Sequence, residues 1–204
     1  MKFRELTIDG AWEITPQQFG DPRGVFLEWY KDAAFVEAVG HSLDLKQGNC
    51  SVSSAGVVRG IHFADVPPSQ AKYVTCPNGA VLDVVVDIRV GSPTFGEWDS
   101  VLLDDVDRRA VYLSEGLGHA FCALEDNSTV VYLCSAPYAP GREHGINPLT
   151  EDVRIDWPKV GRDGQALELL LSEKDTSAPG LLEARDQGLL PSYDEVRRFT
   201  AGLA

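Results

Sequence analysis

Short apolar runs separated by turn residues are the feature of this chain that most restricts its fold. The turn signals include Asp-Pro, Asn-Gly and Gly-Ser-Pro sequences. Between them lie runs rich in β-branched residues, at Val57–Val58, Tyr73–Val74, Ala80–Val90, Val101–Leu103, Ala110–Leu113 and Thr129–Cys134. Short strands with turns at regular intervals are typical of antiparallel sandwiches and barrels. The sequence therefore predicts a chain dominated by β-structure.

The run Ala80–Val90 contains two acidic residues whose environment the sequence leaves open. Side chains alternate between the two faces of a strand, so Asp83 and Asp87 share one face. The opposite face carries Val84, Val86 and Ile88. Acidic residues among valines usually lie on a solvated face, whereas in a small barrel they can line a polar interior.

Helices are expected only near residue 35 and in the C-terminal part, at Asp32–Val39, Gly180–Gln187 and Ser192–Leu203. Ser192 is a candidate N-cap, with Glu195 three residues later. An apolar stripe that would pack against the body of the protein is formed by Tyr193, Val196 and Phe199.

The length of 204 residues corresponds to one domain with a core of its own. We expect a single domain over residues 1–204, with a core from about 3 to 175 and a helical tail from about 180 to 204. The polar, glycine-rich segment 159–166 is expected to be a surface loop.

Charge and hydropathy exclude several classes of partner. The net charge of −13 argues against nucleic acid, because binders of the phosphate backbone carry a basic face. No apolar run approaches the ~20 residues of a membrane span, and the first residues lack the apolar core of a signal peptide. We therefore expect a cytoplasmic protein without a membrane partner.

The four cysteines, Cys50, Cys76, Cys122 and Cys134, are far apart and have no CxxC spacing. This pattern favours reduced core residues over a disulfide or zinc framework.

His62 is the residue best suited to chemistry, because it lies in strand-like sequence between Arg59 and Lys72. An imidazole can accept and return protons near neutral pH, and a neighbouring cation can hold an oxyanion or a phosphate. The alternative from these residues alone is a packed strand histidine with two surface cations nearby.

Five segments, together with their order, resemble the dTDP-4-dehydrorhamnose 3,5-epimerase family. They are Phe19–Glu28, Gln47–Ser53, Gly56–Phe63, Asp83–Gly96 and Leu171–Asp175. The resemblance extends from about Phe3 to Asp175 and implies a cupin-like antiparallel β-sandwich, or jelly roll, that forms a homodimer.

The implied reaction is epimerisation of a dTDP-4-keto-6-deoxyhexose, such as dTDP-4-keto-6-deoxyglucose, at C3, at C5 or at both. It would serve dTDP-L-rhamnose or antibiotic-sugar biosynthesis. The C4 carbonyl acidifies the neighbouring C–H bonds, so a base, an enolate stabiliser and an acid suffice. No cofactor and no metal are expected.

By the resemblance, His62 is the base, Asp175 its carboxylate partner, Tyr132 the proton donor and Lys72 the cation near the sugar carbonyl. The residues alone leave simpler roles open, since Asp175 could be a solvated turn acid and Tyr132 a core tyrosine. The resemblance further implies substrate-binding roles for Arg23, Phe26, Glu28, Gln47, Asn49, Arg59, His119, Tyr138 and Glu143. Among these, Arg59 would bind the diphosphate, Tyr138 and Glu143 would lie near the nucleotide base, and the segment from Phe19 to Glu28 would reach across the dimer interface.

Two positions depart from the family pattern. Ala120 stands where the family more often has glycine, and Ala64 stands where it often has glutamine. We expect the methyl group of Ala120 to narrow the pocket.

Two other classes of function compete with an epimerase, a metal-binding cupin and a non-catalytic sugar-nucleotide binder. The first needs closely spaced histidines, commonly His-x-His, and here Phe63 and Ala64 follow His62, so the second ligand is missing. His41 and His144 lie in loop-like polar stretches.

Overall fold

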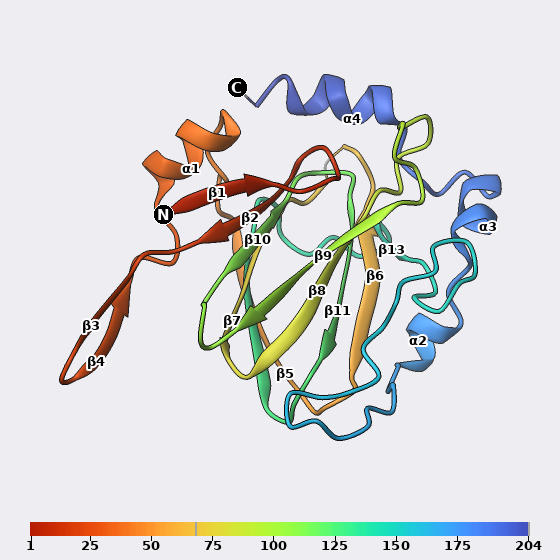
Figure 1. Ribbon diagram of the computed structural model, residues 1–204. Helices are drawn as coiled ribbons and strands as arrows, with labels where there is room; N and C mark the ends of the chain where they lie inside the picture. The colour runs from red at the N-terminus through yellow and green to blue at the C-terminus, as the bar shows by residue number, and fades with distance from the viewer. Residues whose placement is uncertain (68, 204) are drawn as a thin grey trace.

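The computed structural model describes residues 1–67 and 69–203 as two antiparallel sheets packed face to face, a separate hairpin and short helices (Figure 1). The first sheet contains, in spatial order, β1 (Lys2–Glu5), β2 (Ala11–Thr15), β10 (Ala110–Leu113), β7 (Lys72–Asn78), β12 (Ser128–Cys134) and β5 (Gln47–Ser53). The second contains β13 (Glu143–Gly145), β6 (Val58–Ala64), β11 (Gly118–Ala123), β8 (Ala80–Val86) and β9 (Trp98–Asp104). The predicted antiparallel β-sandwich is thereby confirmed.

The space between the sheets is filled by apolar side chains from their two inner faces. The first sheet contributes Val74, Cys76, Val111, Leu113 and Val130, and the second contributes Val81, Val85, Val101, Leu103, Phe121 and Ala123. Because strand side chains alternate, the next residue along each strand faces outwards. The outward residues include Tyr73 and Tyr112 on the first sheet and Val84 and Val86 on the second. Both outer faces are therefore also apolar and must be covered by other parts of the chain.

Helices and loops cover both outer faces. The helix α1 (Asp32–Val39) packs Phe35 against Tyr73 and Tyr112 on the first sheet. The C-terminal segment packs Trp157 and, from α3 (Leu181–Asp186), Leu181 against the outer face of the second sheet. Short helices α2 (Glu173–Thr176) and α4 (Tyr193–Thr200) complete this part of the chain.

All three predicted helices are present, with one difference in detail. Ser192 occupies the N-cap position of α4, but its side chain makes no capping hydrogen bond. Val196 is buried and the flanking Tyr193 and Phe199 are half-buried, as the apolar stripe predicts. The segment 159–166 is an exposed loop, also as predicted.

The predicted strand over Ala80–Val90 ends earlier, at Val86. Asp87 ends it because its carboxylate binds Arg89 and the hydroxyls of Ser92 and Thr94, which folds the chain into a tight turn. The structure also answers the open question about the two acids, since Asp83 and Asp87 are both fully buried.

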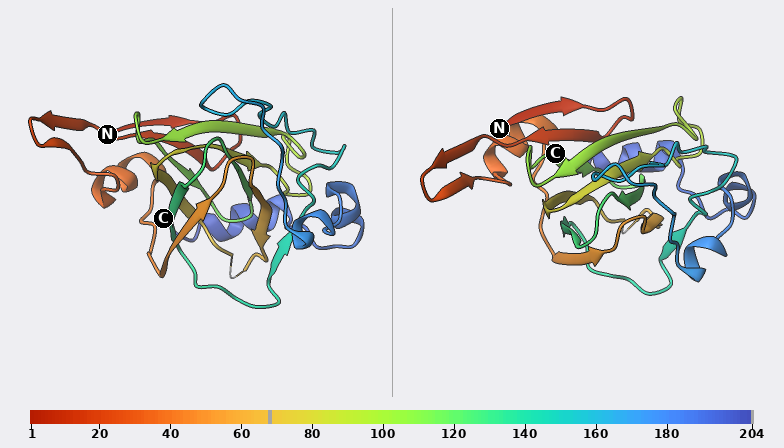
Figure 2. Two further views of the ribbon diagram at one scale, coloured as in Figure 1. Left: turned by 90° about the horizontal axis from the view of Figure 1, so that it is seen from below. Right: turned by 60° about the horizontal axis from the view of Figure 1, so that its bottom comes forward.

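The hairpin of β3 (Gln18–Asp21) and β4 (Gly24–Leu27) projects from the body of the protein (Figures 1 and 2). Its apolar side chains are exposed, with 51% of Phe19 and 67% of Phe26 accessible to solvent. Two-stranded hairpins are marginally stable on their own, so this one is expected to pack against something else.

Within the described ranges, no helix has both the length and the apolar character needed to cross a bilayer. All four cysteines are free, and Cys76, Cys122 and Cys134 are buried as predicted. The prediction was wrong for Cys50, which lies exposed on the edge strand β5.

Candidate active site

Titratable side chains gather between the sheets at one end of the sandwich. Strand register brings them together, because His62 on β6 is paired with His119 on β11 and Lys72 on β7 is paired with Cys134 on β12. The alternation that buries Val74 and Val130 in the inner core directs Lys72 and Cys134 to the same side. Two sheets thus contribute to one polar cluster.

His62 forms a close pair with Asp175, which is 113 residues away in the sequence. The Nε2 atom of His62 lies 2.7 Å from Oδ1 of Asp175. The carboxylate is held by the hydroxyl of Ser172, which donates to its Oδ2 at 2.8 Å and accepts from the Asp175 amide at 3.1 Å. A proton on Nε2 that is donated to Asp175 leaves the lone pair on Nδ1, as a general base requires.

The surroundings keep His62 neutral near pH 7. Burial lowers its pKa, the carboxylate of Asp175 opposes that change, and the cations Lys72 and Lys174 lower the pKa further. Lys174 immediately precedes Asp175 on α2, so the same short helix carries the carboxylate that raises the pKa of His62 and one of the cations that lower it.

A second histidine–carboxylate pair lies beside the first. His119 Nε2 is 2.8 Å from Oδ2 of Asp83, and both residues are buried. Among the residues described, Oδ1 of Asp83 has no hydrogen-bond partner. A fully buried carboxylate oxygen without a partner is rare, and it leaves Asp83 able to accept one more hydrogen bond.

Lys72 is the cation of this cluster. Burial lowers its pKa, whereas Cys134, Glu143 and Asp83 raise it. An ammonium in such a site is poised to stabilise a developing oxyanion, because screening by water is weak there.

Tyr132 lies on the same face of β12 as Val130 and Cys134, as alternation predicts. Burial is the main cause of the raised pKa of Tyr132, and Cys134 and Glu143 add to it. The phenol therefore stays protonated at neutral pH and is available as a hydrogen donor.

The predicted amide pair Gln47 and Asn49 shares a face of β5. Gln47 Nε2 donates to Oδ1 of Asn49 at 2.9 Å, and Asn49 Nδ2 contacts the Cys134 sulfur at 3.5 Å. The Oε1 atom of Gln47 accepts from the amide of Tyr138 at 2.9 Å, which ties the exposed Tyr138 to the rim of the site. Glu143 lies on β13, beside β6.

A cavity of about 320 Å³ opens next to the His62–Asp175 pair. Arg59 and Lys174 line it together with the pair itself. Arg59 is anchored by its Nε, which donates to the Ser53 hydroxyl at 3.2 Å. The cavity thus places two cations beside the base, which suits an anionic group of a ligand.

A family model described as dTDP-4-dehydrorhamnose 3,5-epimerase matches residues 5–183. The chain belongs to this family. It is 61% identical to a dTDP-4-dehydrorhamnose 3,5-epimerase of Mycolicibacterium smegmatis, over 100% of this chain and 97% of that protein. It is 60% identical to a dTDP-4-dehydrorhamnose 3-epimerase of Streptomyces niveus, over 98% and 93%. The solved structure of the rmlC epimerase of Mycobacterium tuberculosis superposes with a TM-score of 0.95 at 59% identity, covering 100% of both chains.

Three of the residues for which the family resemblance implies substrate contacts lie outside this cluster. Arg23 and Phe26 belong to the projecting β3–β4 hairpin, and Glu28 follows it. Arg23 is exposed and pairs with Asp21 of the same hairpin. The hairpin projects from the body of the protein (Figure 2).

The expectation that Ala120 narrows the pocket was wrong. Alternation along β11 directs His119 inwards and Ala120 outwards, where Ala120 is fully buried in the outer core with Val58 and Ile61. A Cβ on Gly60, whose φ is +120°, would lie 2.6 Å from the Ala120 methyl. The methyl of Ala120 therefore leaves no room for a side chain at position 60 of β6, and it does not enter the site.

The prediction that His144 lies in a loop was wrong. His144 lies on β13, not in a loop, and its Nε2 is 2.7 Å from Oδ1 of Asp65. Over residues 1–67 and 69–203, no three His, Cys, Asp or Glu side chains are arranged as a metal site.

Three residues of the cluster were not predicted as part of the epimerase site: Asp83, Cys134 and Lys174. Each had a weak signal in the sequence. Asp83 shares a strand face with a second acid, Cys134 is two residues from Tyr132, and Lys174 precedes Asp175. None of these patterns specifies a partner strand, which is what brings the residues together.

Proposed function

We propose that this protein epimerises a dTDP-4-keto-6-deoxyhexose at C3, at C5 or at both. The observation that supports this most directly is the 2.7 Å contact of His62 Nε2 with Asp175, which leaves Nδ1 free to accept a proton, beside a cavity that both residues line. Family membership supplies the substrate class, and the site supplies groups of the required chemistry.

In the proposed reaction, Nδ1 of His62 removes the proton from the carbon beside the C4 carbonyl. The electron pair moves into an enolate, whose oxygen is stabilised by the ammonium of Lys72. The phenol of Tyr132 then delivers a proton to the opposite face of the carbon. One proton leaves and one returns, so the substrate is neither oxidised nor reduced.

The remaining predicted contacts divide between two copies of the chain. Arg59 would bind the diphosphate through its planar guanidinium, with Lys174 beside it. Gln47, Asn49 and His119 would contact the sugar, while Tyr138 and Glu143 would lie near the base. The partner copy would contribute its hairpin, with Arg23, Phe26 and Glu28.

Proton exchange tests this function. With dTDP-4-keto-6-deoxyglucose in heavy water, we expect deuterium to appear at C3, read by NMR, without any added cofactor. Appearance at C5 as well distinguishes a 3,5-epimerase from a 3-epimerase. Overall identity does not make this distinction, because relatives of both kinds are about 60% identical to this chain. If neither proton exchanges at high protein concentration, the proposal fails.

The pH dependence of kcat/KM follows from the site. His62 acts as a base only when neutral, and burial lowers its pKa below the ordinary value of 6.5. As the pH falls, we therefore expect activity to hold to below pH 6.5 and then to decline as Nδ1 becomes protonated. On the alkaline side, the raised pKa of Tyr132 keeps its proton to beyond pH 10.0. An acidic limb above pH 6.5 in the free-enzyme profile would contradict this assignment of the base.

A homodimer is expected from the exposed apolar hairpin. Sedimentation should give about twice the chain mass of 22.2 kDa at micromolar concentration. Phe26→Ser is expected to weaken dTDP binding, since Phe26 would contact the ligand in the partner's site. Val160→Ser is the matched control, because Val160 is a comparably exposed apolar residue on a separate loop. A fully active monomer would rule out the shared site.

A further inference from the structure

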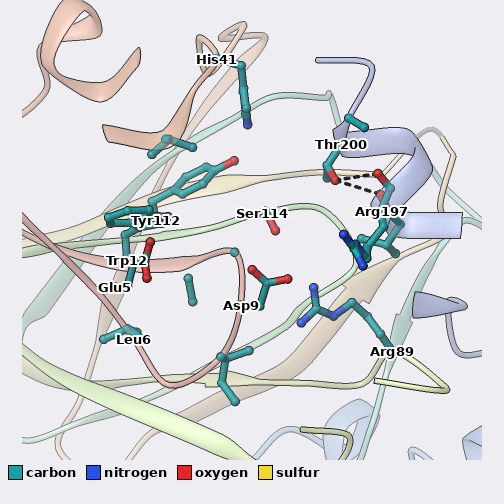
Figure 3. A pocket seen from close by; sticks show the side chains of 16 residues that line it. Glu5, Leu6, Asp9, Trp12, His41, Arg89, Tyr112, Ser114, Arg197 and Thr200 are labelled. Carbon is teal, nitrogen blue, oxygen red and sulfur yellow. Dashed lines mark hydrogen bonds between the residues drawn. The ribbon is translucent and has the colours of Figure 1, made fainter. Parts of the chain in front are cut away.

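A second pocket lies apart from the His62 site, between the β1–β2 turn, the ends of α1 and β10, and α4 (Figure 3). It encloses about 410 Å³, a size that accommodates a small molecule. It shares no lining residue with the cavity beside His62.

One buried polar group of this pocket, the hydroxyl of Tyr112, has no protein partner among the described residues. Tyr112 is fully buried, and within the described part of the chain its hydroxyl makes no hydrogen bond. Figure 3 shows that hydroxyl directed into the pocket, below His41 and across from Thr200. The side chain of Ser114, 7% exposed, lines the same space. Because buried polar atoms almost always have a partner, this wall is suited to polar atoms of a ligand.

Charged side chains form the opposite wall. The guanidinium of Arg89, which is 2% exposed, is bound to Asp87 by two hydrogen bonds of 2.9 and 2.8 Å. Asp87 therefore balances its charge. Arg197 of α4 and the carboxylate of Asp9 lie beside Arg89 in Figure 3, and neither forms an ion pair within the residues described. The wall thus offers donors and an acceptor with little net charge.

The pocket is lined by both acidic and basic side chains, and this combination distinguishes between an anionic, a cationic and an uncharged ligand. A phosphate is anionic at neutral pH and would be repelled by Asp9 and by Glu5, which also lines the pocket. An ammonium only donates and would be repelled by Arg197. A sugar hydroxyl both donates and accepts, and the ring of the partly exposed Trp12 adds apolar surface for a sugar ring. We infer that this pocket binds an uncharged saccharide of about one hexose unit, independently of the nucleotide-sugar site.

The test is a titration of the full-length protein with methyl α-L-rhamnopyranoside and methyl α-D-glucopyranoside, followed by NMR. We expect saturable shifts at the Trp12 indole and at the amides of Ser114 and Thr200 with at least one of them. Saturation of the His62 site with dTDP should leave these shifts in place.

Three variants show whether the pocket is responsible. Asp9→Asn and Arg197→Gln are each expected to weaken saccharide binding by about tenfold, as for loss of one charge-assisted hydrogen bond. Arg198→Gln, on the same helix and outside the pocket, should leave it unchanged. Exchange of the epimerase substrate should be unaffected by all three.

Several results would overturn the inference. These are no saturable shift with either glycoside, shifts that survive Asp9→Asn and Arg197→Gln, shifts abolished by dTDP, or binding of inorganic phosphate but of neither glycoside. None of these outcomes bears on deuterium exchange at C3, so the two proposals are tested separately.

Discussion

Replacing His62 with asparagine is expected to slow deuterium exchange at C3 by about 10²–10⁴-fold or more, the usual contribution of a positioned base. Asparagine is a smaller polar side chain that can still donate a hydrogen bond, but it cannot accept a proton at neutral pH. Affinity for dTDP and the melting temperature should therefore change little. Proton exchange by NMR, dTDP titration and thermal unfolding measure the three effects.

The chain offers a matched control for this variant. His144 forms a histidine–carboxylate contact of the same length, 2.7 Å to Asp65, and packs against Phe63 on the outer side of the sheet. His144→Asn removes a similar pair outside the site, so exchange at C3 should stay close to that of the unaltered protein. Retention of activity within about tenfold in His62→Asn would show that another group is the base.

Tyr132→Phe is expected to separate proton exchange from inversion. Removal of the C3 proton needs only the base, so deuterium should still enter the sugar. Inversion also needs a donor on the opposite face, and phenylalanine lacks one. We expect inversion to fall by about 10²–10⁴-fold while exchange persists, with much of the deuterium returned in the original configuration. NMR of the recovered substrate and product gives both rates.

Thermal stability distinguishes this role from that of a core tyrosine. Over the described residues, the Tyr132 hydroxyl has no hydrogen bond to another side chain or to the backbone, so its loss should barely change the melting temperature. Tyr73→Phe is the contrasting control, since the fully buried Tyr73 hydroxyl donates to the Trp29 carbonyl at 2.6 Å. That change should cost about 1–3 kcal/mol and leave the ratio of exchange to inversion unaltered. An unchanged ratio in Tyr132→Phe would contradict the donor role.

Much of the fold was predictable because its signals are local. Alternation along a strand depends only on neighbouring residues, so the sequence indicates that Val130, Tyr132 and Cys134 share one face, although it does not say which face is buried. The helix over Asp32–Val39 also matched its pattern. The end of β8 at Val86 was not predicted, because it depends on the hydrogen bonds that Asp87 makes within the following turn.

The sequence predicted which residues form the candidate site better than it predicted how their side chains are placed. The family resemblance named His62, Lys72, Tyr132 and Asp175, and the fold gathers them at one end of the sandwich. The resemblance could not show that Ala120 faces away from the site, since that depends on which side of β11 the second sheet's outer core covers.

The sequence alone determined what depends on local order: short strands with alternating faces, the positions of the helices, and side chains able to exchange protons. Tertiary structure decided what depends on register and on contacts across long intervals of chain. It brought Asp175 to His62 across 113 residues, buried Asp83 against His119, and left the hairpin with Phe26 projecting from the body of the protein. The physical reason is that a strand's side-chain pattern specifies which face is buried, whereas the partner strand on that face is chosen by the packing of the whole sandwich.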